Sequence, residues 1–358
     1  MNETGPIDHD ATPATRALLE RLAAGVGEHV LFGHQDTLAT GQTWAAEPGR
    51  SDVLDVTGRH AAVAGFDVGR IELGADANID GVRFDDMVRL VREAHERGQI
   101  VTISWHSVNP ITEGGYADNL APDSIARVLH GGDRHSTLLD WLDRFAAFNA
   151  RLVDADGERI PYVFRPYHEH TGDWFWWGLG APGNTPEQYA ALWHTTFDYL
   201  RGRGVHNVLW SLSPDRSRIS LDRFESDFLA GYPGDAYVDV LGLDDYRDLG
   251  RAPVSLEQQR ADLIASLEGL VAIADARGKI AALTEAGVAH SASHPWTGHL
   301  LPALKASPAT RRVAWALFWR NAPDSSDAPW IPLPGTHAGD DLARMAEDPF
   351  VRFGPAAD

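Results

Sequence analysis

Two glutamates, Glu169 and Glu285, are the residues of this sequence best suited to acid–base and nucleophilic chemistry. Glu169 lies in FRPYHEHTGDWFWWG (164–178), where histidines flank it and tryptophans follow, and Glu285 lies in ALTEAG (282–287). Two carboxyl groups can cleave a glycosidic bond when one protonates the leaving oxygen and the other, ionised, attacks the anomeric carbon. We therefore predict Glu169 as the acid/base and Glu285 as the nucleophile.

The residues near the two glutamates predict opposite protonation states. The aromatic run WFWW after Glu169 would exclude water and favour its neutral acid, whereas Tyr246 and Arg165 could hold Glu285 ionised through a hydrogen bond or through charge. The alternative for either glutamate is that it forms half of a structural ion pair at the rim of the fold.

Four tryptophans are candidate platforms for a sugar, because sugar rings present apolar C–H faces that pack on aromatic planes. They are Trp174, Trp176, Trp177 and Trp319. We expect about half of them to be buried packing instead, as aromatic clusters often are. Trp319 is the preferred platform because the polar residues Arg320 and Asn321 follow it, and Arg320 is included among the predicted substrate-binding residues.

Histidines supply further polar groups. His106, in SWHSVNP, and His168, beside Glu169, could bind sugar hydroxyls or orient the acid, and a structural role is the alternative for His106. HEH also suggests a metal site, but on an extended strand His168 and His170 would point away from Glu169. Since the sequence has neither an HExxH helix nor a cysteine thiolate, we predict no metal and no cofactor. A metal-dependent hydrolase using His168 and His170 is the competing hypothesis.

The elements that must position these residues alternate between strand-like and helix-like segments. Eight short apolar or aromatic runs are separated by segments with helical apolar spacing, which predicts one α/β domain with the (β/α)8 TIM barrel fold. Seven runs end in polar or ionisable residues, as the strands of a catalytic barrel do. GHQD (33–36) and GFD (65–67) are expected to form a polar floor. The runs are residues 30–34, 61–67, 100–106, 161–169, 208–214, 238–246, 280–287 and 313–321.

Length, charge and composition limit the function classes. We expect one catalytic domain over residues 1–358, with a C-terminal loop and helix in 323–358. The formal charge of −20 disfavours nucleic acid and anionic membranes as partners, and the absence of cysteine excludes disulfides and a cysteine nucleophile. No GxSxG, Walker or GxGxxG motif supports a serine hydrolase or a nucleotide-binding protein.

The N-terminal residues, MNETGPIDHDATPAT, lack the basic and apolar regions of a signal peptide, and no apolar run approaches the roughly 18 residues that span a bilayer. The expected location is extracellular if a signal peptide was removed and cytoplasmic if this N-terminus is native. We expect a monomer.

Several motifs together resemble glycoside hydrolase family 26. FRPYHEHTGDWFWWG is similar to the acid/base region of that family and ALTEAG to its nucleophile strand. VLFGHQD (30–36), VTISWHSVNPIT (101–112) and FWRNA (318–322) resemble its other landmarks in the same order. The resemblance spans residues 30–322.

The resemblance implies a (β/α)8 fold and a retaining mechanism without a cofactor, acting on β-1,4-mannan or manno-oligosaccharides as a mannan endo-1,4-β-mannosidase. It assigns Glu169 as acid/base and Glu285 as nucleophile. It also implies that His106, His168, Trp174, Tyr246 and Trp319 surround the sugar at the cleavage point. The alternatives are the same chemistry on β-1,3-xylan or mixed-linkage β-glucan, and a catalytically silent sugar-binding barrel.

Overall fold

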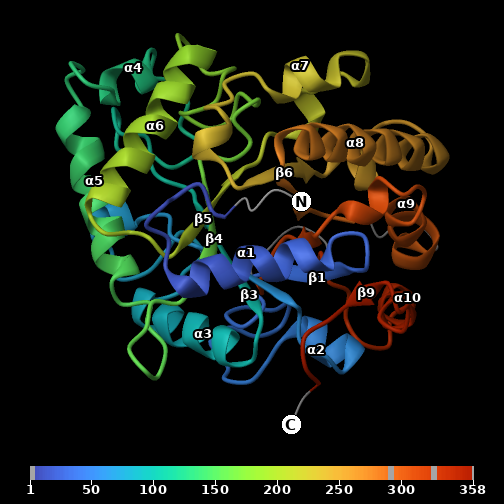
Figure 1. Cartoon of the computed structure of the whole chain (residues 1–358). Helices are drawn as coiled ribbons and strands as arrows, with labels where there is room; N and C mark the ends of the chain where they lie inside the picture. Colours follow the sequence, from blue (N-terminus) through green and yellow to red (C-terminus); the bar gives the residue numbers. More distant parts are fainter. Residues whose placement is uncertain (1–4, 289–293, 324–328, 357–358) are drawn as a thin grey trace. The chain divides into compact units, whose positions relative to one another are not determined.

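The computed structural model describes residues 5–288, 294–323 and 329–356 (Figure 1). The strands of this part of the chain are β1 (Val30–Gln35), β2 (Val63–Asp67), β3 (Ile100–Trp105), β4 (Tyr162–Pro166), β5 (Val208–Leu212), β6 (Val240–Asp245), β7 (Ile280–Ala286), β8 (Trp315–Phe318) and β9 (Val351–Arg352).

The α-helices of the described residues occupy the segments between the strands. They are α1 (Pro13–Gly25), α2 (Asp52–Thr57), α3 (Phe84–Glu96), α4 (Ser124–Val128), α5 (His135–Asn149), α6 (Pro186–Gly202), α7 (Phe224–Phe228), α8 (Leu256–Arg277), α9 (Leu301–Leu304) and α10 (His337–Met345). In the described part of the chain, none of the helices combines the length and apolarity needed to cross a membrane.

The first eight strands close on themselves. Their order in the sheet is β2-β3-β4-β5-β6-β7-β8-β1, and β1 also pairs with β2. β1 runs parallel to both β2 and β8. This closed order, with helical segments between the strands, confirms the predicted (β/α)8 barrel.

The strand boundaries differ from the predicted runs in ways that matter for the site. Each run contains one barrel strand, but β4 ends at Pro166, three residues before Glu169, and β8 ends at Phe318, directly before Trp319. The sequence did not predict β9, which pairs in parallel with the start of β1. Glu169 therefore lies on the turn that follows β4, whereas Glu285 lies within β7.

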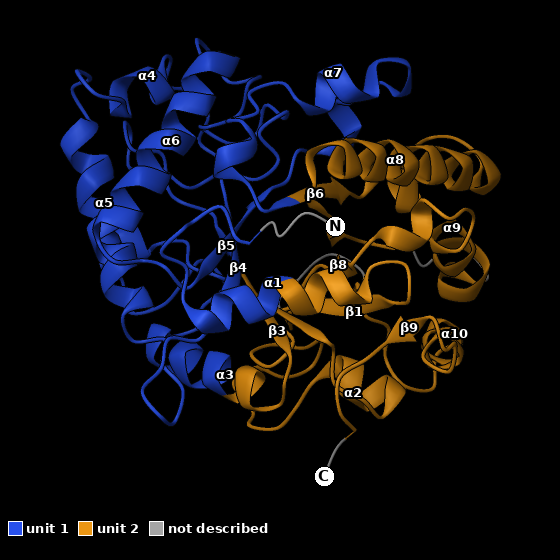
Figure 2. Cartoon of the chain, in the orientation of Figure 1, with its two compact units in different colours: residues 1–19, 67–92, 103–240 blue, residues 20–66, 93–102, 241–358 orange. Residues whose placement is uncertain are grey.

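The chain divides into two compact units (Figure 2). Unit 1 comprises residues 1–19, 67–92 and 103–240. Its core is rich in aromatic rings: Phe164 of β4 stacks on Phe145 of α5 at 4.5 Å between ring centroids and meets Trp210 of β5 edge-on at 5.4 Å. These contacts fix β4, from which the segment that carries Glu169 continues.

Unit 2 comprises residues 20–66, 93–102 and 241–358. Phe32 of β1 is the centre of its aromatic cluster, with ring centroids 5.1 Å from Phe318, 5.8 Å from Trp296 and 4.6 Å from Phe353. The cluster joins β1, β8 and the segment after β9, so it holds β8, which pairs with the strand β7 that carries Glu285.

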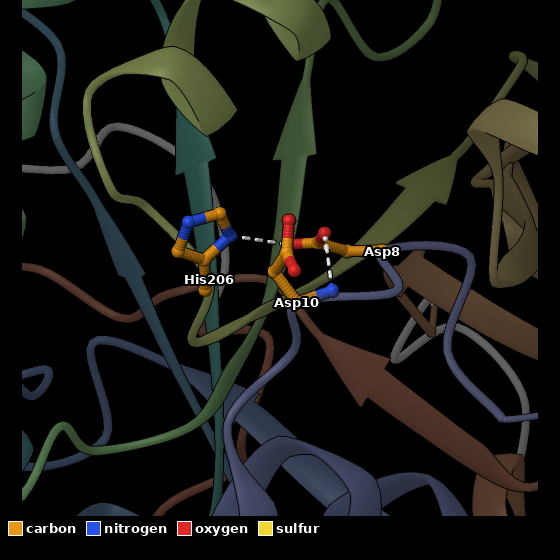
Figure 3. Close-up of side chains that lie close together, drawn as sticks. All are labelled: Asp8, Asp10 and His206. Carbon is orange, nitrogen blue, oxygen red and sulfur yellow. Dashed lines mark hydrogen bonds and ion pairs between the residues drawn. The ribbon is translucent and has the colours of Figure 1, made fainter.

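A charge network attaches the N-terminal segment within unit 1 (Figure 3). Asp8, Asp10 and His206 place three potential metal-ligating atoms within 4.8 Å of one another. However, Arg201 forms ion pairs with Asp8 at 2.8 Å and Asp10 at 3.3 Å, and His206 Nδ1 lies 2.8 Å from Asp8. Because the Arg201 guanidinium pairs with both carboxylates and Asp8 also holds His206, we interpret the cluster as a structural ion-pair network.

Candidate active site

The turn after β4 carries Glu169 in a strained but firmly held conformation. Tyr167 and Glu169 have φ angles of 50° and 54°, which non-glycine residues rarely adopt. The carbonyl of Tyr167 accepts the Tyr189 hydroxyl at 2.8 Å, and that of His168 accepts Trp177 Nε1 at 2.7 Å. Glu169 donates its own N–H to the Ser213 carbonyl at 2.6 Å. Such strain persists only where surrounding contacts determine the backbone, and it is concentrated at functional sites.

The Glu169 carboxyl group is 8% exposed and receives a hydrogen bond from Trp174 Nε1 to its Oε2 at 2.6 Å. The Arg218 guanidinium packs on the Trp174 indole, 5.5 Å from its ring centroid. The same guanidinium forms an ion pair with Asp173 at 2.6 Å, which holds it in this position. Because the indole N–H can only donate, Oε2 is the acceptor, which favours Oε1 as the oxygen that carries the proton when Glu169 is neutral.

A hydrogen-bonded chain of three side chains lies beside Glu169. Asp67 at the end of β2 accepts His106 Nδ1–H at 2.7 Å, and His106 Nε2 lies 3.1 Å from His168 Nε2. Burial, followed by the charges of His106 and Arg165, lowers the pKa of His168 well below its usual value. Because the Asp67 carboxylate can only accept, a neutral His106 carries its proton on Nδ1. Its Nε2 then accepts the N–H of His168. Asp67 thus orients both histidines, which gives the predicted polar floor a specific role.

A buried carboxylate that the sequence analysis missed supports the segment around His106. Glu72 accepts Trp105 Nε1 at 2.8 Å and the backbone N–H of Val108 at 2.7 Å. Burial raises its pKa above the usual value. Its role depends on contacts with residues 33 and 36 positions later in the chain, beyond α3, and no local pattern marks it.

His170 is a structural residue. Its Nε2 lies 2.9 Å from the carbonyl of Ala230, and its ring stacks on Tyr189 with centroids 4.2 Å apart. We expected His168, Glu169 and His170 to lie on one extended strand and therefore excluded a metal site. This expectation was wrong, because β4 ends at Pro166. The hydrogen bond to Ala230 nevertheless occupies one ring nitrogen of His170.

The His170 imidazole should make stability depend on pH. Burial lowers its pKa to about 4, whereas an unfolded histidine titrates near 6.5, so the unfolded state takes up the proton first. The contribution of His170 to stability is complete above about pH 6.5 and is lost as pH falls towards about 4. The loss reaches roughly 2 kcal/mol by pH 5.

Urea unfolding of His170→Gln between pH 4.5 and 7 measures this effect, and we expect a shallower loss of stability on acidification than in the wild type. His194→Gln is the matched control, since His194 contacts the Pro233 carbonyl at 2.7 Å but is partly exposed. Equal slopes for the wild type and His170→Gln would contradict the prediction.

Glu285, near the end of β7, is held by the neighbouring strand of unit 2. The Tyr246 hydroxyl donates to Glu285 Oε1 at 2.9 Å, and the Glu285 side chain is 4% exposed. The preceding residue, Thr284, donates its hydroxyl to Asp244 at 2.7 Å, which fixes the alignment of β6 and β7. The predicted contact between Tyr246 and Glu285 is therefore present, and it orients the Glu285 carboxyl group.

Two residues that the sequence analysis did not single out hold Tyr246 in place. The Arg251 guanidinium lies 4.4 Å from the Tyr246 ring and 5.2 Å from the ring of Trp330, and the two rings are 5.4 Å apart. Gly287 is required here, because a Cβ on it would lie 2.2 Å from Trp330 and 2.8 Å from Tyr246. Trp330 lies in the loop after β8, within the segment for which the sequence predicted only a C-terminal loop and helix.

Asp52 connects the loops that follow β1 and β8. It accepts Trp44 Nε1 at 2.7 Å and Asn321 Nδ2 at 2.6 Å. Asn321 in turn bonds the backbone of Ile331 in both directions, at 2.8 and 3.1 Å. This network places the chain next to Trp330, so Asn321 has a structural role in addition to marking the strand end.

The predicted aromatic platforms separate into two groups. Trp176 and Trp177 are fully buried, as expected for about half of the four tryptophans, whereas Trp174 and Trp319 are partly exposed. Trp319 donates its backbone N–H to the carbonyl of Ala286 at 2.8 Å, which places it beside the residue after Glu285. Arg320 is also partly exposed.

Comparisons with known proteins place these features in a family. The model of glycosyl hydrolase family 26 matches residues 7–299. A protein of Bifidobacterium adolescentis named mannan endo-1,4-beta-mannosidase is 35% identical over 294 residues, which cover 80% of this chain and 28% of that protein. A protein of the same name from Thermothelomyces thermophilus is 30% identical over 69% of this chain and 47% of its own length. The chain thus spans less than half the length of these two relatives.

Solved structures agree with these sequence matches. The GH26 beta-mannanase BoMan26A of Bacteroides ovatus superposes with a TM-score of 0.87 at 38% identity, over 96% of this chain and 95% of that chain. A modular endo-beta-1,4-mannanase of Cellulomonas fimi gives a TM-score of 0.87 at 35% identity, over 98% of this chain and 77% of that chain. With a family match over most of its residues, the chain belongs to glycosyl hydrolase family 26.

Proposed function

We propose that this protein is a retaining β-mannanase that cleaves β-1,4-mannosidic linkages in mannan or manno-oligosaccharides. The observation that carries the proposal is the likeness, over nearly the whole chain, to a solved β-mannanase of the same family. The two buried carboxyl groups support it, since each receives one hydrogen bond from a side chain that can fix its orientation. We infer one catalytic domain, acting as a monomer on an uncharged polysaccharide, with no role for nucleic acid or membrane.

In the first step, Glu285 attacks the anomeric carbon and Glu169 protonates the glycosidic oxygen, so the leaving sugar departs as an alcohol and a covalent mannosyl-enzyme forms. In the second step, Glu169 removes a proton from water, whose oxygen attacks the same carbon and releases Glu285 as a carboxylate. For this mechanism the two carboxyl groups are expected about 5–5.5 Å apart.

The neighbouring residues have proposed roles that follow from their contacts. Trp174 directs the Glu169 proton to Oε1, the oxygen that would face the leaving group. Tyr246 stabilises the Glu285 carboxylate, and the pair His106 and His168 is proposed to bind sugar hydroxyls near the cleavage point. Trp319 and Arg320, which are partly exposed after β8, are proposed to contact the sugar ring.

Tyr246→Phe tests the hold on the nucleophile. Removing a hydrogen bond to a charged group costs about 1.5–3 kcal/mol, so kcat on mannan should fall by roughly 10- to 100-fold while the fold is retained. Tyr232→Phe is the matched control, because the Tyr232 hydroxyl donates to Asp235 at 2.7 Å at an exposed position. Equal kcat values for the two variants would contradict the role of Tyr246.

A substrate panel tests the proposed activity. Purified protein is incubated with linear β-1,4-mannan, mannohexaose, β-1,3-xylan and mixed-linkage β-glucan, and the products are separated by chromatography. We expect manno-oligosaccharides from the first two substrates, and mixed lengths would indicate cleavage within the chain. Products from the xylan or the glucan alone would replace mannan as the substrate, and binding without cleavage would indicate a sugar-binding barrel.

A further inference from the structure

A cavity lies in unit 2 at the N-terminal ends of its strands, whereas Glu285 and Tyr246 lie at the opposite, C-terminal ends. Its volume is about 330 Å³. Residues at the start of β1 and directly before β2 and β8 line one side, represented by Leu31, Ala62 and Ala314. The end of α1 and the segment around β9 close the other side. The volume is within the range of small-molecule sites, at its lower end.

Three groups capable of carrying positive charge surround this cavity: Arg21 of α1, His29 before β1, and Arg352 of β9. Within the described residues, no carboxylate lies within 4 Å of either guanidinium. Arg21 donates Nη2–H to the carbonyl of Gly98 at 2.7 Å, a contact that leaves its charge uncompensated.

This local positive charge is unusual for the protein, whose formal charge is −20. Several other arginines pair with carboxylates, as Arg312 does with Asp275 at 2.8 Å. Two unpaired guanidinium groups beside a cavity form a binding site for an anion, because arginine binds carboxylate and phosphate through several N–H donors. Leu22 and Phe353 add an apolar wall.

We propose that this cavity binds a small organic anion, a carboxylate of about monosaccharide size, held between Arg21 and Arg352 and packed against Phe353. The site is separate from the proposed catalytic residues and does not depend on their assignment. Its ligand class follows from the combination of cationic donors, an apolar wall and a volume of about 330 Å³.

His29 provides a direct probe of the site. Burial and the charges of Arg352 and Arg21 lower the pKa of His29. The charge of Glu28 acts in the opposite direction and raises that pKa. The ring occupies the space left by Gly25, where a Cβ would lie 3.0 Å from Nε2. A bound anion opposes the arginine charges, so it should raise the pKa of His29, and by linkage it should bind more tightly as pH falls.

The test is a titration of the intact chain with glucuronate, glucose and inorganic phosphate at low ionic strength, followed by calorimetry and by the His29 imidazole NMR signals. Glucuronate and glucose differ in the carboxylate, so they separate charge recognition from sugar binding. We expect saturable binding of glucuronate, weaker binding of phosphate, no binding of glucose, and a raised pKa of His29 in the glucuronate complex.

Arg21→Ser and Arg352→Ser should each weaken glucuronate binding by about tenfold or more, the cost of one charge-assisted contact. The exposed Arg83→Ser, which changes the net charge equally, should leave it unchanged. Turnover of mannan should be unaffected in all three variants. The proposal is overturned if glucuronate does not bind the wild type, if glucose or phosphate binds as tightly, or if both cavity variants retain full affinity.

Discussion

Glu285→Ala should reduce kcat on mannan by at least about four orders of magnitude, because it removes the group that forms the covalent intermediate. The Tyr246 hydroxyl, 2.9 Å from Glu285 Oε1, would remain in place without its acceptor. The measurement is reducing-end release from linear mannan under saturating conditions. With azide added, the cavity left by the side chain should admit the anion, and the product should be the α-glycosyl azide, formed by a single inversion.

The matched control for this variant is Glu268→Ala, an exposed glutamate within α8. It should retain full activity, and both variants should unfold at similar temperatures. A Glu285→Ala protein that is folded and retains more than a few per cent of the activity would show that another residue is the nucleophile.

Glu169→Ala should affect the two chemical steps differently. Loss of a general acid or base typically costs about 10²- to 10⁴-fold, and mannan, whose leaving group needs protonation, should show the full effect. An aryl mannobioside with a very acidic phenol needs no such proton, so its first step should remain fast. The mannosyl-enzyme should then accumulate, visible as a burst of phenol and as a mass increase on the protein.

Azide should restore turnover to Glu169→Ala, because azide attacks the mannosyl-enzyme in place of the water that Glu169 would activate. The product should be the β-glycosyl azide, with net retention of the anomeric configuration. The exposed Glu158→Ala is the control for a change in charge. Equal losses on mannan and on the activated substrate would contradict an acid/base role. They would suggest that the hydrogen bond from Trp174 to Glu169 serves the fold alone.

The sequence predicted the parts of this structure that depend on local pattern. Each of the eight apolar runs contains a barrel strand, because buried parallel strands require continuous apolar residues whatever their partners are. The contact between Tyr246 and Glu285 was also predictable, since Tyr246 directly follows β6 and Glu285 lies near the end of the neighbouring strand β7. Asp67 was expected only as part of a polar floor, and the structure shows that it orients His106.

The missed features depend on contacts between distant segments or on unusual backbone angles. Arg251 and Trp330, which hold Tyr246, lie on loops after two different strands, and nothing in either loop sequence indicates that they meet. The left-handed angles at Tyr167 and Glu169 are set by hydrogen bonds, not by glycine or asparagine in the turn: Tyr189 and Trp177 donate to this segment, and Glu169 donates its N–H to the Ser213 carbonyl. Tertiary contacts therefore override the local preference.

The most direct test of the proposed double displacement is the anomeric form of the first product. Mannohexaose is hydrolysed in the NMR tube, and the anomeric proton signals of the new reducing end are followed from the first minutes. We predict that the β-anomer appears first and then mutarotates to the equilibrium mixture. Initial appearance of the α-anomer, or no cleavage of mannohexaose, would contradict a retaining β-mannanase.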